Sequence, residues 1–381
     1  MTTEMNDGNC TRFPDALWHA ERAKRLQQVR DGGLKLRPDF DVVAARWEAW
    51  WRFEAEHPLL RVAVPMDLSL RWDNGFDLMD RPDEWVRLRR CQVENTQFFG
   101  EEVPSARVNI GPVALAAFLG APLHLAQQEH TSWQDPIIES WPYRPGFVLN
   151  PDNVWFRRVA ELMRRLAEDA AGDYLVCFPD VAGALDVLAN LRGSERLCMD
   201  LFDNREHILA AARAIMSAWG EMFATLSDAV LDAGAGTTQW LGCWSDRPYA
   251  VATCDFNALI GCEDFNEVCL PSLHDQALRS GRCIFHLDGY AAARHADALA
   301  ADPAIHAIQF VPGAGTPSAL PKIDMLRRIQ AAGKPVIVTC LAEEVEALCD
   351  QLDPHGLALM PSDVESAAEA ESLVAVAVAT R

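Results

Sequence analysis

A histidine and an aspartate, His286 and Asp288, follow a short apolar run in the stretch CIFHLDG. Side chains two residues apart lie on the same face of a β-strand, so both should point to one side at the carboxyl end of this strand. An imidazole and a carboxylate in that arrangement suit a divalent metal ion or a polar substrate. The structural alternative is that Asp288 caps the following helix while His286 packs under the loop.

Other reactive or metal-binding side chains follow short apolar runs in the same way. Asp180 comes after LVCFP, Asp255 lies in ATCDFNAL, and Cys340 ends PVIVTC. A carboxyl group whose pKa is raised by burial can transfer protons, so Asp180, Asp255 and Asp288 are the catalytic candidates, with helix capping as the alternative. Cys340 is a candidate third metal ligand beside His286 and Asp288.

Further residues near these strand ends are candidates for contacts with a substrate. The loop VPGAG offers backbone N–H groups to an anion, although a tight turn would equally require its glycines. The histidines among them have a purely structural role as their alternative. The candidates are His130, Trp133, Trp244, His295 and Gly313.

From about residue 152 onward, short apolar runs alternate with amphipathic helix patterns. Such an alternation, at intervals of roughly 16 to 30 residues, indicates parallel strands joined by helical crossovers. No Gly-x-Gly-x-x-Gly follows an early strand, which favours a (β/α)8 TIM barrel over a dinucleotide-binding sheet. In such a barrel the functional groups lie at the carboxyl ends of the strands. The predicted strands include 173–180, 237–244, 282–289, 305–313, 335–340 and 356–361.

The N-terminal region departs from this rhythm. Residues 15–31 and 39–56 have the pattern of amphipathic helices, and the second carries a cluster of tryptophans before the strand-like run LLRVAVP. We therefore predict an N-terminal helical extension or lid over residues 1–58 and an α/β barrel over residues 59–381. The tryptophans would either pack this extension or cover an apolar ligand.

Composition limits the classes of partner. The 381-residue chain carries 55 acidic and 34 basic residues, a net charge of −21, so it should repel nucleic acid and anionic membrane surfaces. No apolar run is long enough for a membrane span, and no secretion signal is evident. The eleven cysteines contain no Cys-x-x-Cys and are expected to be reduced thiols. These features predict a cytoplasmic protein.

Several stretches resemble the uroporphyrinogen decarboxylase superfamily, in particular its branch of uncharacterised, often bacterial, decarboxylase-like proteins. The resemblance is carried by TCDFNALIGCEDFNEVCLPSL, by CIFHLDGYAAARHADALAADPAIHAIQFVPGAG, and by the earlier RWEAWWRFEAEHPLLRVAVP, NIGPVALAAFLGAPL and FPDVAGALDVLANLRGSERLCMDLFD. It covers most of the chain and implies a (β/α)8 barrel, with a homodimer as one expected assembly.

The resemblance implies two chemistries. One branch of the superfamily transfers a methyl group between a corrinoid protein and a thiol, with zinc held by a His-x-Cys at a strand end and a later cysteine. Here the triplet is His286-Leu287-Asp288, and LMPSDVES has no cysteine near the last strand, which leaves Cys340 as the substitute. We expect methyl transfer of this kind. Zinc is the candidate metal, and a corrinoid protein is the candidate partner. The alternatives are a cofactor-independent decarboxylase of a porphyrinogen-like or other small acid, and a barrel that binds a ligand or partner without catalysis.

Overall fold

The computed structural model describes residues 33–70, 73–232, 236–316 and 318–380. The predicted helix at 15–31 lies outside these residues. The larger of two main sheets has seven strands, and all its pairings are parallel except that between β1 and β2. Its strands, in spatial order, are β2 (Thr96–Gly100), β1 (Leu59–Pro65), β13 (Leu357–Pro361), β12 (Val336–Cys340), β11 (Ala307–Val311), β10 (Cys283–Asp288) and β9 (Ala250–Thr253).

A second sheet contains four strands. β3 pairs with β6 and β6 with β7 in parallel, while β8 returns antiparallel beside β7. A separate antiparallel pair, β4 and β5, forms a small ribbon. The bounds are β3 (Ser105–Arg107), β6 (Leu175–Phe178), β7 (Thr237–Gln239), β8 (Trp244–Ser245), β4 (Leu123–Ala126) and β5 (Thr131–Gln134).

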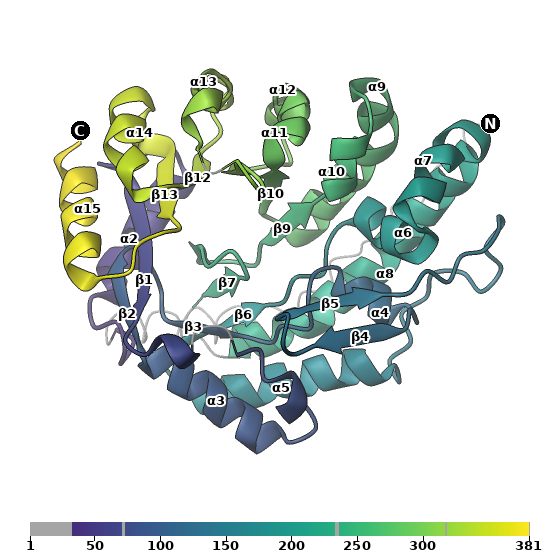
Figure 1. The fold of residues 1–381 in the computed structure, drawn as a ribbon, viewed down its shortest axis with the longest axis horizontal. Coiled ribbons are helices and arrows are strands. Elements are labelled where there is room, and N and C mark those ends of the chain that lie inside the picture. The colour runs from purple at the N-terminus through teal and green to yellow at the C-terminus, as the bar shows by residue number, and fades with distance from the viewer. Residues whose placement is uncertain (1–32, 71–72, 233–235, 317, 381) are drawn as a thin grey trace, which may run out of the picture.

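Most helices lie on the outer side of both sheets, and the strands lie inside them (Figure 1); α2 (Phe40–Trp51) instead packs against the amino ends of the strands. Their amphipathic patterns place apolar stripes against the strands in one large core. The helices are α2 (Phe40–Trp51), α3 (Pro82–Glu94), α4 (Ala114–Phe118), α5 (Val154–Ala170), α6 (Ala184–Arg192), α7 (Ser194–Asp203), α8 (Arg205–Asp232), α9 (Cys262–Asp264), α10 (Leu270–Ser280), α11 (Gly289–Ala292), α12 (Ala296–Ala301), α13 (Ile323–Ala331), α14 (Val345–Gln351) and α15 (Ala367–Ala379).

The structure confirms a mixed α/β fold rich in parallel strands, because the predicted alternation reappears from α5 to α15. The hydrogen-bonded strands do not form the closed ring of the predicted barrel. Within the described residues, no strand pairing joins β2 to β3 or β8 to β9, so the hydrogen bonds form two sheets. The predicted strands do not include β2, β3, β9 or the β4–β5 ribbon. None of the described helices combines the length and apolarity that crossing a membrane requires.

The strand face turned away from the outer helices, here called the inner face, is apolar near the amino ends of the strands. A second hydrophobic cluster lies there, and the tryptophans of α2 pack into it. Trp47 and Trp50 are fully buried, and the Nε1–H of Trp47 donates to the carbonyl oxygen of Glu101 over 3.0 Å. The tryptophans therefore pack α2 against the amino ends of the strands. The strand members of the cluster are Leu59, Leu175, Trp244, Val251, Ile284, Ala307, Ile337 and Ala358.

Candidate metal centre

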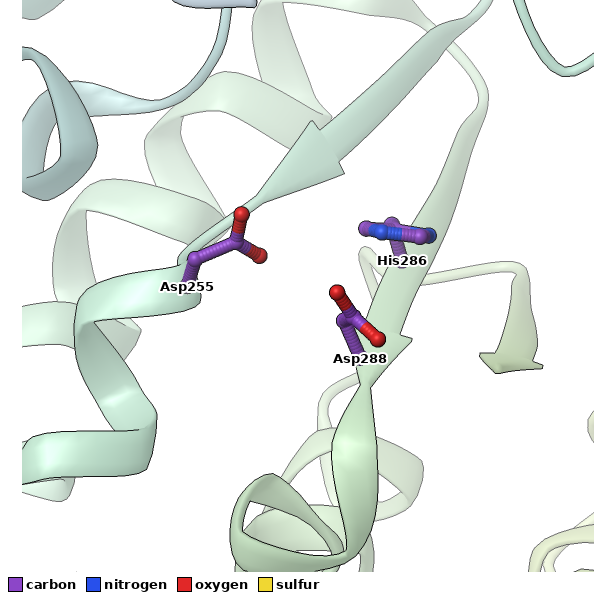
Figure 2. Close-up of side chains that lie close together, drawn as sticks. All are labelled: Asp255, His286 and Asp288. Atoms are coloured by element: carbon purple, nitrogen blue, oxygen red, sulfur yellow. The ribbon is translucent and has the colours of Figure 1, made fainter. Parts of the chain in front are cut away.

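Asp255, His286 and Asp288 converge at the carboxyl ends of β9 and β10. A ligand atom from each lies within 4.8 Å of the others, and Figure 2 shows the two carboxylates and the imidazole facing a common space. His286 and Asp288 are half-buried, while Asp255 is exposed. One nitrogen and two carboxylate donors at this spacing can hold a divalent metal ion.

Strand geometry explains the convergence. On β10 the intervening Leu287 points into the buried core, so His286 and Asp288 share the inner face. In the parallel pairing of the two strands, Thr253 is the partner of His286. Asp255 comes two residues after Thr253 and therefore reaches the level of Asp288, which comes two residues after His286.

The neighbouring strands fix the state of the imidazole. The Nδ1 of His286 is hydrogen-bonded to Oε1 of Gln309, its register partner on β11. The Nε2–H of Gln309 donates in turn to Oγ1 of Thr339 on β12 over 3.1 Å, which orients the Gln309 amide with its oxygen toward the histidine. A protonated Nδ1 leaves the lone pair on Nε2, the form in which a histidine binds a metal. The Trp240 ring meets the imidazole edge-on at 5.2 Å.

The capping alternative does not account for Asp288. It occupies the residue before α11, yet its side chain accepts no capping hydrogen bond from that helix. A half-buried carboxylate at a helix start without this bond remains available to a ligand.

The pKa values of two carboxyl groups here, those of Asp180 and Asp255, are raised above the usual range. Burial raises the pKa of Asp180 to about 6, although the nearby His286 lowers it, as does the N–H of Ala182, 3.3 Å from Oδ1. Although part of the Asp255 residue is exposed, neighbouring atoms desolvate its carboxyl group and so raise its pKa. His286 opposes this shift, and the Asp288 and Asp180 carboxylates add to it. Because three carboxyl groups crowd one imidazole, a cation placed among them would relieve their repulsion.

Cys340 does not join this group. On β12 the side chains alternate, so Thr339 shares the face of His286 and Cys340 lies in the core against the outer helices. Its thiol is 1% exposed, and burial raises its pKa well above the usual range. Asp255, and not Cys340, is therefore the third group beside His286 and Asp288. Cys340 directly follows Thr339, whose side chain is on the inner face, so the Cys340 side chain points to the opposite face.

Two of the predicted substrate contacts lie elsewhere in the protein. Trp244 is fully buried in the second hydrophobic cluster, edge-on to Phe40 of α2 at 5.7 Å, and hence near the amino ends of the strands. His295 is 1% exposed and stacks on Phe265 at 4.2 Å, with Nε2 3.0 Å from the carbonyl oxygen of Asn257. Burial lowers the pKa of His295, as expected for a structural histidine.

The remaining predicted contacts lie in loops and on the ribbon. His130 and Trp133 are exposed on the β4–β5 ribbon, where Trp133 stacks on His124 at 5.2 Å. Gly313 has φ 92° and lies against Gly289, where an added Cβ would come 2.8 Å from the Gly289 Cα. Gly289 directly follows Asp288. A side chain at position 313 would collide with it, so this close approach accounts for the glycine and no bound anion is needed to explain it.

Sequence reasoning missed the residues that support the imidazole. Gln309 and Thr339 lie within predicted strands, and Trp240 within another. A polar side chain within an otherwise apolar strand, as in AIQFV and VIVTC, could have indicated these residues. Such a residue is buried at a cost unless it finds a partner, and here the partner is the next strand.

Comparison with known proteins supports the fold. A solved structure described as a methyltransferase from Methanosarcina mazei superposes with a TM-score of 0.62, covering 88% of this chain and 98% of that one at 12% sequence identity. Identity this low demonstrates a shared fold only. No family model and no curated protein matches the sequence, so the resemblance to the uroporphyrinogen decarboxylase superfamily is not confirmed.

Proposed function

We propose that this protein is a methyltransferase-like enzyme in which Asp255, His286 and Asp288 hold a divalent metal ion, with zinc as the leading candidate. The observation that carries the proposal is the approach of these three side chains to within 4.8 Å at the carboxyl ends of the strands. The similarity in fold to a methyltransferase supports the reaction class. We also infer that the two sheets are the walls of a (β/α)8 barrel, with residues 1–58 as an extension to it.

The donor set fits zinc. An imidazole nitrogen and carboxylate oxygens are ordinary zinc ligands, and three protein ligands leave a position for a substrate atom. The Gln309 contact supports Nε2 as the ligand nitrogen. A bound zinc ion would lower the pKa of a thiol and so supply a thiolate at neutral pH.

The chain's own residues would then orient the acceptor and handle its proton. Asp180, with a pKa of about 6, is suited to accept the thiol proton near neutral pH. A corrinoid would supply the methyl group. The thiolate sulfur would form its bond to the methyl carbon as the donor's bond to that carbon breaks, with the electron pair of the broken bond left on the donor. We propose a corrinoid protein as the donor.

The test combines metal binding with turnover. Metal analysis of the purified protein should find about one zinc ion per chain, and calorimetric titration of the stripped protein should give one site. His286→Ala should abolish both, whereas His355→Ala, which removes an exposed histidine paired with Asp353, should leave both unchanged. Methylcobalamin with a small thiol should be demethylated only by the zinc-loaded protein, as followed by its visible absorbance.

A second candidate is cofactor-independent decarboxylation, favoured by the raised pKa of Asp180 and Asp255. A carboxyl group that keeps its proton near pH 6 can deliver it to the carbon that loses carbon dioxide. Carbon dioxide release from a pyrrole carboxylic acid, undiminished by chelator and lost in Asp180→Asn, would favour this reaction over methyl transfer. A folded protein that binds neither zinc nor such an acid would favour a non-catalytic binding role.

A further inference from the structure

Arg89 on α3 is a buried cation with incomplete hydrogen bonding. The residue is 8% exposed, and among the described residues Nε and Nη2 of its guanidinium have no hydrogen-bond partner. Its Nη1–H donates to Oε1 of Gln92 over 2.7 Å, and the guanidinium lies 4.7 Å from the centre of the Trp85 ring. Buried guanidinium groups normally have a carboxylate or several acceptors, because an unpaired buried charge is strongly destabilising.

Among the described residues, no acidic side chain hydrogen-bonds Arg89, although Asp73 offsets part of its charge. Glu102 binds Arg61 instead, with both carboxylate oxygens 2.8 Å from Nη2. Asp73 is close enough to interact with Arg89 electrostatically, but its Oδ1 accepts from the N–H of Gly75 and from Nε2 of Gln127. Arg107 adds a second positive charge close to Arg89. The two arginines thus create an excess of positive charge.

These arginines line one cavity of about 350 Å³ between β2 and β3. Ser105 and Glu102 line the same cavity, with Glu102 held by Arg61. Gln92 and Thr96 also line it, but the Nε2–H groups of Gln92 donate to the carbonyl oxygens of Leu70 and Asp73, and the Thr96 hydroxyl donates to that of Gln92. The donors for an anion are therefore chiefly those of the two arginines. Burial lowers the pKa of Arg89 to about 10, and Arg107 adds to that shift while Asp73 opposes it, so the guanidinium stays charged at neutral pH. The cavity therefore offers a charged, underused donor group together with space.

We propose that this cavity binds a small oxyanion group, a carboxylate or a phosphate, between Arg89 and Arg107. The Nε and Nη2 atoms of Arg89 are covered in this structure, so the guanidinium would turn toward the cavity to offer them for a bidentate contact, the geometry that arginine favours with both groups. Arg107 would supply the second charge from the end of β3. Its Nη1 also lies 3.5 Å from the carbonyl oxygen of Trp240, whose ring contacts His286. Trp240 thus lies between Arg107 and the candidate metal centre, but anion binding in the cavity does not require a metal.

The test measures anion binding to the full, metal-stripped chain. Inorganic phosphate and acetate are added separately at constant ionic strength, and the melting temperature and the heat of binding are recorded. At least one should raise the melting temperature saturably. Arg89→Gln and Arg107→Gln should each weaken the apparent affinity at least about tenfold. Arg87→Gln, which alters an exposed arginine on the same helix, should retain the wild-type affinity.

The outcomes separate this proposal from the metal centre. No saturable effect of either anion, or equal affinity in Arg89→Gln and the wild type, would overturn it. If Arg89→Gln fails to fold, Arg107→Gln decides alone, because Arg107 is exposed and its replacement leaves the core intact. Zinc titration of Arg107→Gln should match the wild type. Loss of zinc binding in His286→Ala with anion binding retained would likewise show that the two sites are independent.

Discussion

Gln309 lies directly opposite His286 in the parallel pairing of β11 with β10, and its amide oxygen meets Nδ1 of the imidazole. The Thr339 hydroxyl on the next strand holds that amide in place. Three consecutive strands thus determine which nitrogen of His286 faces the carboxylates. A histidine held in this way loses little rotational freedom when it binds an ion.

Replacing Gln309 should weaken metal binding without removing a ligand. We expect Gln309→Leu to lower zinc affinity by about 10- to 100-fold, since the imidazole then lacks the partner that fixes its tautomer. Calorimetric titration measures the change, with Gln351→Leu at an exposed glutamine as the control. Unchanged zinc affinity in Gln309→Leu would contradict the assigned supporting role.

Replacing Cys340 should not change the affinity for the metal. Because its thiol lies in the core on the opposite face from His286, Cys340→Ala should keep the wild-type zinc affinity. The variant should lose about 1 kcal/mol of unfolding free energy through the small cavity that it leaves. Zinc titration and urea denaturation measure the two effects. A large loss of zinc affinity would reinstate Cys340 as a ligand.

Asp180 should make stability depend on pH. Its pKa is about 6 in the folded protein and 3.8 when unperturbed, so the folded state binds more protons between these values and stability falls as pH rises through that window. Asp180→Asn removes this penalty and should raise the unfolding free energy at pH 8 by up to about 3 kcal/mol. The gain should vanish as the pH falls to about 4.

Urea denaturation across this pH range tests the Asp180 prediction. Asp324→Asn is a suitable control, because the Asp324 carboxylate is 85% exposed and should give no such pH-dependent gain. A gain for Asp180→Asn that is the same at pH 4 and pH 8 would show that the effect is unrelated to ionisation.

The tryptophans of α2 should matter for stability and not for the site. Trp47→Ala removes a fully buried indole and its hydrogen bond to Glu101, and we expect a loss of about 3–5 kcal/mol of unfolding free energy. Zinc affinity of the folded variant should stay unchanged, since α2 packs near the amino ends of the strands. Trp133→Ala, at a tryptophan that is 52% exposed, is the matched control with little expected loss.

The sequence by itself determined the alternation of strands and helices and the placement of His286 and Asp288 on one strand face. Both follow from local periodicity, because side chains alternate along a strand wherever it lies. The same rule, applied along PVIVTC, indicates that Thr339 and Cys340 face opposite ways. It does not say which of the two faces the imidazole.

Only the tertiary structure decided which third group meets His286 and Asp288. That choice depends on the register between neighbouring strands, in which Thr253 lies beside His286 and brings Asp255 level with Asp288. The burial of Trp244 beneath α2, and the lack of hydrogen-bond partners for Nε and Nη2 of Arg89 among the described residues, depend in the same way on contacts between distant segments. Register and packing arise from the whole core, and no short stretch of sequence encodes them.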